Sequence, residues 1–269
     1  MNEWFAWREA PEAEFGVIGD PVSHSLSPRM HQAAYDALGL PYRYSAIQVP
    51  AGEVELALTR LHSLGYQGIN VTVPHKGEAL EWAEKVEPLA RRVHAANTLR
   101  LSDKACINTD APGFLDTLVD FPPETPTALL LGAGGTARAL AVALNQAGYE
   151  LYFYNRTASK AYALAEELGL ATSQVRKTAD PSGVSLILNT TSASLNNDEL
   201  PIQWDKAEGG ALAYDLMYSK TLTPFLKTAS QHGLRTVDGI HMLVAQGAHA
   251  FTWWLGLDAP RAAMLEAIR

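Results

Sequence analysis

The segment GINVTVPHKG, residues 68–77, places a lysine where a strand pattern has just ended. Side chains alternate along a strand, so Asn70 and Thr72 would share one face while the two valines share the other. The proline that follows cannot continue the ladder of a central strand. Lys76 is then either a solvated surface lysine, which is the commoner case, or an ammonium group placed to exchange a proton with a ligand.

Two later segments offer partners for this lysine. In CINTDAPGF, Asp110 follows a short apolar run, and in AANT, Asn97 precedes the strand-like stretch TLRL. A carboxylate close to Lys76 would keep the ammonium group charged and oriented. We therefore expect Lys76 and Asp110 to form a proton-transfer pair beside a hydride acceptor.

The segment GDPVSHSLSP carries two hydroxyl groups immediately before a predicted helix. Ser25 and Ser27, with the N–H groups of that helix N-terminus, could bind a carboxylate. Ser27 could equally be a simple N-cap, and the segment alone leaves both possibilities open. If the strand FGVIG pairs in parallel with GINVTV, Asn70, Thr72 and Lys76 would gather near these serines, because ligands bind beyond the carboxyl ends of such strands.

A glycine motif follows an apolar strand pattern in the middle of the chain. In ALLLGAGGTARALAVALNQAGYELYFYNRT the spacing Gly-x-Gly-x-x-Ala lies between a strand and a helix, which is typical of a dinucleotide-binding turn. The two glycines would allow the tight turn and the close approach of a pyrophosphate, and the alanine would allow close helix–sheet packing. The alternative is a glycine turn without a ligand. The predicted phosphate-binding residues are Gly132, Ala133, Gly134, Gly135, Thr136 and Ala137.

The end of the next strand distinguishes the two nicotinamide cofactors. NAD sites usually carry Asp or Glu there, on the ribose 2′-hydroxyl. This chain instead carries Asn155, Arg156, Thr157 and Lys160. A guanidinium, a hydroxyl and an ammonium group suit a 2′-phosphate. We therefore predict NADP as the cofactor; the alternative is a surface turn with two ordinary basic residues.

The elements that must position these residues alternate between strands and helices. The sequence predicts strands at residues 15–19, 42–49, 68–73, 185–193 and 210–218, helices at 27–40, 52–65 and 76–86, and a strand–turn–helix–strand unit at 128–157. Such alternation predicts an α/β fold with a mostly parallel sheet. Three prolines within residues 119–127 interrupt the pattern, and they indicate a linker or the loop that enters a second unit.

The bulk composition excludes several classes of protein. Of the 269 residues, 47% are hydrophobic, which is typical of a globular chain, and the formal net charge of −8 disfavours a nucleic-acid partner. A single cysteine, Cys106, excludes a disulfide framework and fits a cytoplasmic location. The N-terminus is not typical of a signal peptide, and no apolar run predicts a membrane helix. The eight histidines lack the clustered spacing of a metal-dependent hydrolase.

Eight motifs resemble, in order, those of the shikimate dehydrogenase family: SHSLSP, NVTVPHK, AANT, NTDAPGF, GAGGTARA, NRT, YDLMYSKTLTPF and DGIHMLVAQGAHAF. The resemblance implies the reversible reduction of 3-dehydroshikimate to shikimate with NADPH, on the route to chorismate and the aromatic amino acids. It also implies two domains. Residues 1–111 and 240–269 would form an α/β substrate domain, and residues 112–239 a Rossmann-type, doubly wound NADP-binding domain.

The same resemblance implies roles for individual residues. Lys76 and Asp110 would be the catalytic pair, while His75 would be structural. The expected substrate contacts are Ser25 and Ser27 for the carboxylate, Asn70, Thr72, Asn97 and Gln246 for ring hydroxyls, and Tyr218 at the junction with the nicotinamide. Further expected cofactor contacts are Thr191, Met217 and Gly239.

Three positions depart from the family pattern: Ser194 and His241 stand where glycine is common, and Gly247 stands where alanine is usual. Two rival functions remain open. A quinate/shikimate dehydrogenase would use NAD or accept quinate, and a non-catalytic ligand sensor could share the fold without the Lys–Asp pair. We expect a monomer or homodimer that binds a small-molecule substrate and no membrane. The N-terminal segment MNEWFAWREAPEAE is an extension with two tryptophans and no assigned function.

Overall fold

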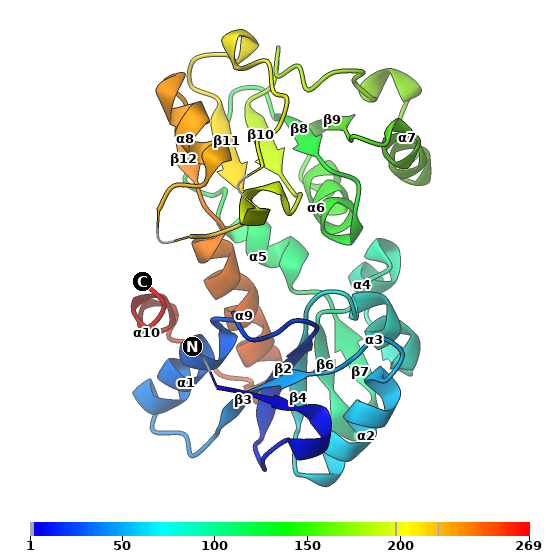
Figure 1. Ribbon diagram of the computed structural model, residues 1–269, viewed down its shortest axis with the longest axis vertical. Helices are drawn as coiled ribbons and strands as arrows, with labels where there is room; N and C mark the ends of the chain where they lie inside the picture. The colour runs from blue at the N-terminus through cyan, green and yellow to red at the C-terminus, as the bar shows by residue number, and fades with distance from the viewer. Residues whose placement is uncertain (1–2, 197, 220) are drawn as a thin grey trace. The chain divides into compact units, whose positions relative to one another are not determined.

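Figure 1 shows the computed structural model, which describes residues 3–196, 198–219 and 221–269. The chain forms two compact units. Unit 1 contains the described residues up to Gly113 together with Leu243–Arg269, and unit 2 contains Phe114–Met242. Each unit combines a sheet with helices, so the predicted α/β class is confirmed.

Unit 1 is built, in the described part of the chain, on a seven-stranded sheet of order β1-β3-β2-β4-β6-β7-β5. Only the pairs that β6 makes with β4 and β7 are antiparallel; the other neighbours are parallel. The strands are β1 (Trp4–Ala6), β2 (Phe15–Gly19), β3 (Tyr44–Gln48), β4 (Gly68–Val71), β5 (Lys85–Val86), β6 (Thr98–Arg100) and β7 (Ala105–Ile107).

The pairing of β2 with β4 positions the candidate site. These strands are parallel neighbours, with Val17 opposite Asn70 and Ile18 opposite Val71. Their carboxyl ends therefore lie at the same edge of the sheet. The serine-containing segment follows β2, and Lys76 follows β4.

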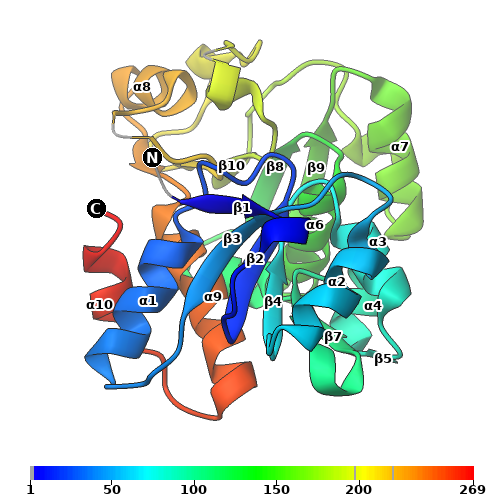
Figure 2. The same ribbon diagram turned by 60° about the horizontal axis from the view of Figure 1, so that its bottom comes forward.

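Helices cover both faces of this sheet, as Figure 2 shows. The helices are α1 (Ser27–Ala37), α2 (Val54–Ser63), α3 (Lys76–Trp82), α4 (Pro88–Val93), α5 (Asp110–Asp116), α9 (Ile240–Leu255) and α10 (Arg261–Glu266). On the face of α2, α3 and α4, Ile18, Ile69 and Val71 enter an apolar core. On the face of α1 and α9, the ring of Phe15 packs against Trp254 at 4.9 Å between centroids. The polar residue Asn70 alternates with Ile69 and Val71 and so faces this second side.

Unit 2 is a doubly wound sheet, as predicted. Its order in the described residues is β12-β11-β10-β8-β9, and every neighbouring pair is parallel. The elements are β8 (Thr127–Leu131), α6 (Gly135–Gln146), β9 (Glu150–Tyr154), α7 (Ala158–Glu167), β10 (Leu186–Asn189), β11 (Leu212–Asp215), α8 (Pro224–Gln231) and β12 (Arg235–Val237). The strand order reverses at β8, where ligands bind in sheets of this kind.

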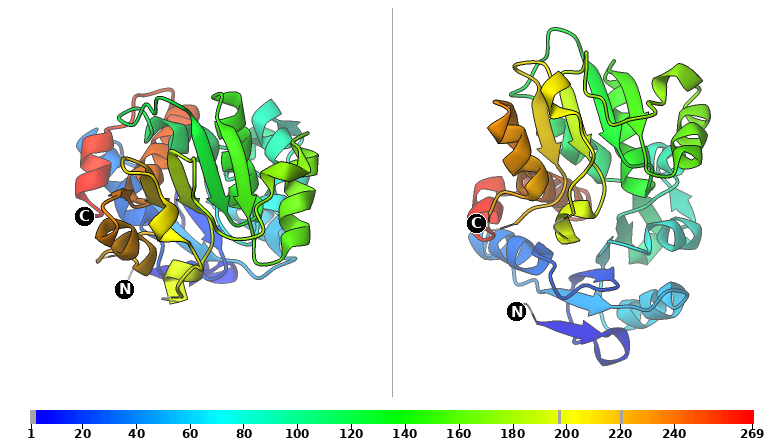
Figure 3. Two further views of the ribbon diagram at one scale, coloured as in Figure 1. Left: turned by 90° about the horizontal axis from the view of Figure 1, so that it is seen from above. Right: turned by 45° about the horizontal axis from the view of Figure 1, so that its top comes forward.

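Two apolar layers sandwich the sheet of unit 2. One contains Leu140 and Leu164 from α6 and α7, and the other contains Phe225 and Leu226 from α8. In the right-hand view of Figure 3, α6 and α7 lie on one side of this sheet and α8 on the other, in keeping with the two layers. The α8 helix begins cleanly because Thr223 caps it by accepting the N–H of Leu226.

Several local predictions were wrong in their bounds. The helix predicted at 76–86 ends at Trp82, because Lys85 and Val86 pair with β7 as β5. The strand predicted at 68–73 ends at Val71, so Val73 is 59% exposed and does not share the buried face of Val71. Ser27 is the first residue of α1, not its cap; Leu26 stands at the cap position without a side-chain hydrogen bond.

The proline-rich segment and the N-terminal extension also have defined places. The prolines of residues 119–127 lie in the loop that leads into β8, which begins at Thr127, while the boundary between the units lies upstream, within α5. The extension forms β1, which pairs in parallel with β3 at the sheet edge. Next to it, Trp7 is buried and its indole N–H donates to Glu53 Oε2 at 2.6 Å.

Candidate active site

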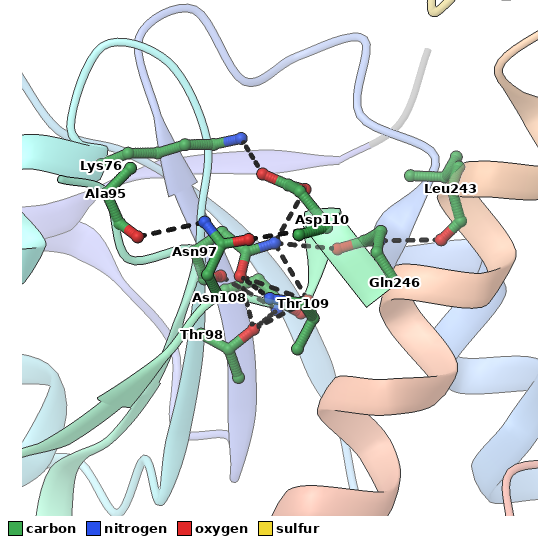
Figure 4. Close-up of polar contacts among 11 residues, drawn as sticks. Lys76, Ala95, Asn97, Thr98, Asn108, Thr109, Asp110, Leu243 and Gln246 are labelled. Carbon is green, nitrogen blue, oxygen red and sulfur yellow. Dashed lines mark hydrogen bonds and ion pairs between the residues drawn. The ribbon is translucent and has the colours of Figure 1, made fainter. Parts of the chain in front are cut away.

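The Lys76–Asp110 ion pair is the centre of the polar cluster in unit 1 (Figure 4). Lys76 Nζ lies 2.6 Å from Asp110 Oδ2, and the two side chains are 21% and 10% exposed. Lys76 is the first residue of α3 and Asp110 the first of α5. A carboxylate at a helix N-terminus is favoured by the helix dipole. The pair is thus largely shielded, yet still accessible to a ligand.

Asn97 connects this pair to the rest of the cluster (Figure 4). Its Nδ2 donates to Asp110 Oδ1 at 2.9 Å and to Thr109 Oγ1 at 3.0 Å, with Gln246 Oε1 at 3.5 Å. Its Oδ1 accepts the backbone N–H of Thr109 at 2.8 Å. These bonds fix the amide orientation, so one oxygen of Asp110 faces Asn97 and the other faces Lys76.

Asn70, on β4, is the second buried hub, by which we mean an asparagine with several buried hydrogen-bond partners. Its Nδ2 donates to the backbone carbonyl of Asn97 at 3.2 Å and to Thr98 Oγ1 at 3.0 Å. Its Oδ1 accepts the hydroxyl of Tyr44 at 2.7 Å. Thr98 in turn donates to Asn97 Oδ1 at 3.2 Å, so the two asparagine hubs are linked.

The two serines lie at the start of α1. Ser25 Oγ accepts the backbone N–H of Ser27 at 3.3 Å, and Ser27 is buried whereas Ser25 is half-buried. Burial raises the pKa of the Tyr44 phenol well above its usual value, and the nearby Ser27 hydroxyl opposes the shift. Tyr44 is in turn hydrogen-bonded to Asn70.

Thr72 and Gln246 complete the set placed in unit 1. Thr72 follows β4, is half-buried, and its backbone N–H donates to the carbonyl of Ile18 at 2.9 Å. Gln246 lies on α9, where its Nε2 donates to the carbonyl of Leu243 at 2.8 Å (Figure 4). Its oxygen is thereby turned towards Asn97. Unit 1 thus contains Ser25, Ser27, Asn70, Thr72, Lys76, Asn97, Asp110 and Gln246.

His75 directly precedes Lys76 but is fully buried. Its Nε2 lies 2.6 Å from the carbonyl of Val49, and its Nδ1 lies 3.6 Å from Glu78. His75 has helical backbone angles at the cap position of α3. Its contacts join the start of α3 to the segment after β3, which is a structural position.

In unit 2 the glycine turn has the geometry that a dinucleotide requires. Gly132 has φ +116°, and a Cβ there would collide with Thr190, so only glycine fits. A Cβ on Gly134 or Gly135 would instead meet no atom within 4 Å, which leaves the backbone open to a phosphate. Ala137 is fully buried in the helix–sheet core. Ala133 and Thr136 are half-buried in the same turn.

The basic segment lies beside this turn. Gly132 N–H donates to the carbonyl of Tyr154, the last residue of β9, at 2.8 Å. Asn155 follows directly, and its Nδ2 donates to the carbonyl of Thr157 at 2.8 Å, which closes a tight turn. Arg156 and Lys160 are exposed. Because the acid typical of NAD sites is absent here, these residues fit the 2′-phosphate of NADP.

A buried carboxylate organises the two loops that carry Thr191 and Met217. Asp215, at the end of β11, is 0% exposed, and Asn189 lies opposite it at the end of β10. Asp215 accepts the N–H of Met217 at 3.1 Å and the amide of Asn189 at 3.0 Å. Asn189 Oδ1 accepts the N–H of Thr191 at 3.0 Å. Burial raises the pKa of Asp215 although these donors oppose the shift.

The three departures from the family pattern have different surroundings. Ser194 Oγ donates to Asp215 Oδ2 at 2.6 Å, so the added hydroxyl joins this buried network. His241 is exposed on the first turn of α9. A Cβ on Gly247 would overlap the Met30 side chain, so α9 and α1 pack more closely there than alanine would allow without movement.

Two further predicted residues lie in unit 2. Gly239 is required by packing, because a Cβ there would collide with the carbonyl of Leu216. Its N–H donates to the carbonyl of Met217 at 3.3 Å. Tyr218 follows Met217 and is half-buried. Unit 2 thus holds Tyr218 and all the predicted cofactor residues.

Sequence reasoning missed Tyr44, Thr98 and Asp215. Tyr44 lies in a strand whose alternation reads as core, and its polar partner is 26 residues away in the chain. The motif YDLMY contains Asp215, and a charged residue at the end of an apolar strand was the available signal. No group of three or more His, Cys, Asp or Glu in the described residues could hold a metal ion. Nor, within the same residues, is any helix long and apolar enough to cross a membrane.

Comparison with known proteins identifies relatives of this chain. Residues 17–99 match the shikimate dehydrogenase substrate binding domain, and residues 239–269 match the shikimate 5'-dehydrogenase C-terminal domain. The chain is 41% identical to a shikimate dehydrogenase (NADP(+)) of Moorella thermoacetica, over 94% of this chain and 91% of that protein. It is 39% identical to a shikimate dehydrogenase (NADP(+)) of Natronomonas pharaonis, over 95% of this chain and 98% of that protein.

A solved structure is also similar. It is the shikimate 5-dehydrogenase of Thermus thermophilus in complex with NADP(H) and shikimate. The two chains superpose with a TM-score of 0.88 at 38% identity, covering 96% of this chain and 98% of the other.

Proposed function

Because the chain belongs to the shikimate dehydrogenase family, we propose that it catalyses the reversible NADPH-dependent reduction of 3-dehydroshikimate to shikimate. The observation that carries the proposal is the shielded Lys76–Asp110 pair, 2.6 Å apart, in a cluster of amides and hydroxyls. Such a pair can move a proton, and the cluster can bind a polyhydroxylated ring. The product, shikimate, feeds the synthesis of chorismate and the aromatic amino acids.

The pair acts on the oxygen that changes oxidation state. NADPH held by unit 2 would supply the hydride that reduces the carbonyl carbon. Lys76 Nζ donates a proton to the carbonyl oxygen, so that a hydroxyl forms. Asp110 holds the ammonium group in place, because its Oδ2 lies 2.6 Å from Lys76 Nζ, and shares the proton. In the reverse direction the pair accepts the hydroxyl proton.

Unit 1 binds the substrate. Ser25 and Ser27 bind its carboxylate at the start of α1, and their hydroxyls can donate to an anion there. The ring hydroxyls are bound by Asn70, Asn97 and Gln246, which belong to the same cluster, and by Thr72 after β4. Tyr218, which lies in unit 2, would contact the substrate and the nicotinamide, as the family resemblance implies. His75 contacts Val49 and Glu78 and so helps to hold the start of α3, which carries Lys76.

Unit 2 binds NADP(H). The turn Gly132–Ala137 accepts the pyrophosphate, since its glycines leave the backbone open and α6 supplies free N–H groups. Asn155, Arg156, Thr157 and Lys160 hold the 2′-phosphate. Thr191, Met217 and Gly239 lie on the loops at the carboxyl ends of the strands and would contact the nicotinamide half.

The partners follow from this chemistry. The protein acts on small molecules in the cytoplasm as a monomer or homodimer, and its net charge of −8 disfavours nucleic acid. The substrate domain comprises unit 1 and the cofactor domain unit 2.

Initial rates of nicotinamide reduction test the proposal. Shikimate or quinate is paired with NADP⁺ or NAD⁺ in four parallel mixtures. A fast rate only with shikimate and NADP⁺ is the expected result. Comparable rates with quinate or NAD⁺ would indicate the broader dehydrogenase. Absence of any rate while shikimate still binds would indicate a ligand sensor.

A further inference from the structure

The close packing of α5 against α9 in unit 1 depends on Gly113, a residue outside the proposed site. Gly113 is buried and follows Asp110 on α5 at the i+3 position, so the two residues share a face of that helix. A Cβ on Gly113 would lie 2.6 Å from the backbone nitrogen of Gln246 and 2.8 Å from its Cα. Backbone atoms cannot turn aside as the end of a side chain can. The two helices therefore approach this closely only because residue 113 is a glycine.

This approach brings the Gln246 side chain to the polar cluster. Its Nε2 donates to the carbonyl of Leu243 on the same helix, at 2.8 Å. Its Oε1 lies 3.5 Å from Asn97 Nδ2, whereas Asp110 Oδ1 lies 2.9 Å from that nitrogen. Figure 4 shows Asp110 and Gln246 projecting from the two helices towards Asn97. Because 3.5 Å is already long for a hydrogen bond, any retreat of α9 would remove Gln246 from the cluster.

The start of α5 is firmly held. Asp110 is bound by Lys76 Nζ at 2.6 Å and by Asn97 Nδ2 at 2.9 Å. Asn108 adds a further bond, because its Oδ1 accepts the N–H of Ala111 at 3.2 Å. A side chain at position 113 would therefore leave Asp110 in place and act on the neighbouring helix.

The α9 helix can yield at Gln246. Its hydrogen bond to the sheet lies about two turns further along, where the indole N–H of Trp254 donates to the carbonyl of Leu99 at 2.9 Å. Beside Gln246, Gly247 faces the end of the Met30 side chain rather than backbone. A methionine side chain is flexible and adapts to a changed gap. This part of α9 is thus the one that moves.

We propose that Gly113 is a positioning residue for the substrate site: the lack of a side chain there lets α9 approach until Gln246 can bind a ring hydroxyl. The inference rests on the proposed function and deepens it. With alanine at position 113, α9 must retreat by roughly 1 Å to reach an ordinary contact distance. Gln246 is then too far from the ligand, whereas the Lys76–Asp110 pair keeps its geometry.

The test is the Gly113→Ala variant. Alanine favours a helix over glycine by about 1 kcal/mol, so the local effect on α5 is stabilising and cannot explain a loss. We expect the KM for shikimate to rise about tenfold, while kcat and the KM for NADP⁺ stay within about threefold of the wild type. Gly247→Ala is the matched control, because it adds the same methyl group beside Gln246 but meets the flexible end of Met30. Its KM for shikimate should stay within about twofold of the wild type.

A double-mutant cycle separates the positioning of Gln246 from a general disturbance of the fold. Gln246→Ala alone should raise the KM for shikimate about tenfold. Because Gly113 acts through Gln246, adding Gly113→Ala to that variant should change the KM by less than about twofold. Gln246→Asn shortens the side chain by one methylene group and leaves the helix packing intact. It should also raise the KM, which tests the inference even if Gly113→Ala does not fold.

An unchanged KM for shikimate in Gly113→Ala or in Gln246→Asn would overturn the inference. So would a fully additive rise in the double variant, an equal rise in Gly247→Ala, or a fall in kcat without a rise in KM, which would mean that Asp110 had moved. Any of these results with an active wild type leaves the proposed function intact. A wild type that shows no rate with shikimate and NADP⁺ would overturn the proposed function, and the inference with it.

Discussion

The backbone N–H of Gly132 donates to the carbonyl of Tyr154 at 2.8 Å, which joins the glycine turn to the end of the neighbouring strand. The basic segment begins at the next residue. One hydrogen bond thus places the two parts of the proposed cofactor site side by side: the open backbone proposed for the pyrophosphate and the segment with Arg156, proposed for the ribose phosphate. Residues 155–160 contain no Asp or Glu, which NAD sites usually carry at this place.

Replacing Arg156 with alanine should shift the cofactor preference. The guanidinium would contact only the 2′-phosphate, so the KM for NADP⁺ should rise about tenfold or more while the KM for NAD⁺ changes by less than about twofold. Steady-state kinetics with both cofactors measure this. Lys227→Ala is the matched control, because it removes an exposed positive charge from α8, on the opposite face of the sheet. An equal rise in the KM for both cofactors would mean that Arg156 does not bind the 2′-phosphate.

Ser194 should contribute to stability as well as to cofactor binding. Its hydroxyl is one of the donors to the fully buried Asp215, 2.6 Å away. Ser194→Ala should lower the free energy of unfolding by about 1–3 kcal/mol, because a buried carboxylate loses a donor. It should also raise the KM for NADP⁺, because Asp215 holds the N–H of Met217. Urea unfolding measures the free energy of unfolding of Ser194→Ala, with Ser192→Ala as a control at an exposed serine. Equal free energies of unfolding for the two variants would contradict the prediction.

His31 should make unfolding sensitive to acid. Burial lowers the pKa of this histidine from 6.5 to about 3, and neither ring nitrogen has a hydrogen-bond partner among the described residues. Above pH 6.5 the ring is neutral in both states. Below it, the unfolded chain binds a proton that the native chain excludes, so stability falls as pH drops from 6.5 towards 3, by up to about 1.4 kcal/mol per pH unit.

The variant His31→Phe keeps an aromatic ring against Tyr44 and cannot ionise. Its free energy of unfolding, measured by denaturant titration from pH 7 to pH 4, should therefore fall less steeply than that of the wild type. His62→Gln, at an exposed histidine, should leave the profile unchanged. Parallel profiles for wild type and His31→Phe would show that this ring is protonated in the native state.

The parts of the fold that could be predicted are those with strong local patterns. The strand Phe15–Gly19 and the strand–turn–helix unit around Gly132 were predicted correctly, because apolar runs bounded by glycines are typical of buried parallel strands. The turn at Gly132 could also be predicted, because a glycine in this motif indicates a backbone conformation with positive φ, which the structure has. Local chemistry decides these features.

Other features depend on contacts between distant residues. The strand β1 has only three residues, and it exists because β3 offers an unpaired edge. Likewise, Lys85 and Val86 leave the predicted helix because β7 lies beside them. The local sequence pattern does not show which distant strand a segment will pair with. The same holds for Tyr44, which reads as a core residue until Asn70 is seen beside it.

The most direct test of the account is the kcat of Lys76→Ala in shikimate oxidation with NADP⁺. Lys85→Ala is the control, because it breaks an exposed lysine–carboxylate pair of the same unit, with Asp103 at 3.2 Å. We predict that kcat falls about 10²–10⁴-fold in Lys76→Ala while the KM for shikimate changes little, and that Lys85→Ala matches the wild type. A Lys76→Ala variant that keeps most of its kcat would contradict the assignment of Lys76 and Asp110 as the proton-transfer pair.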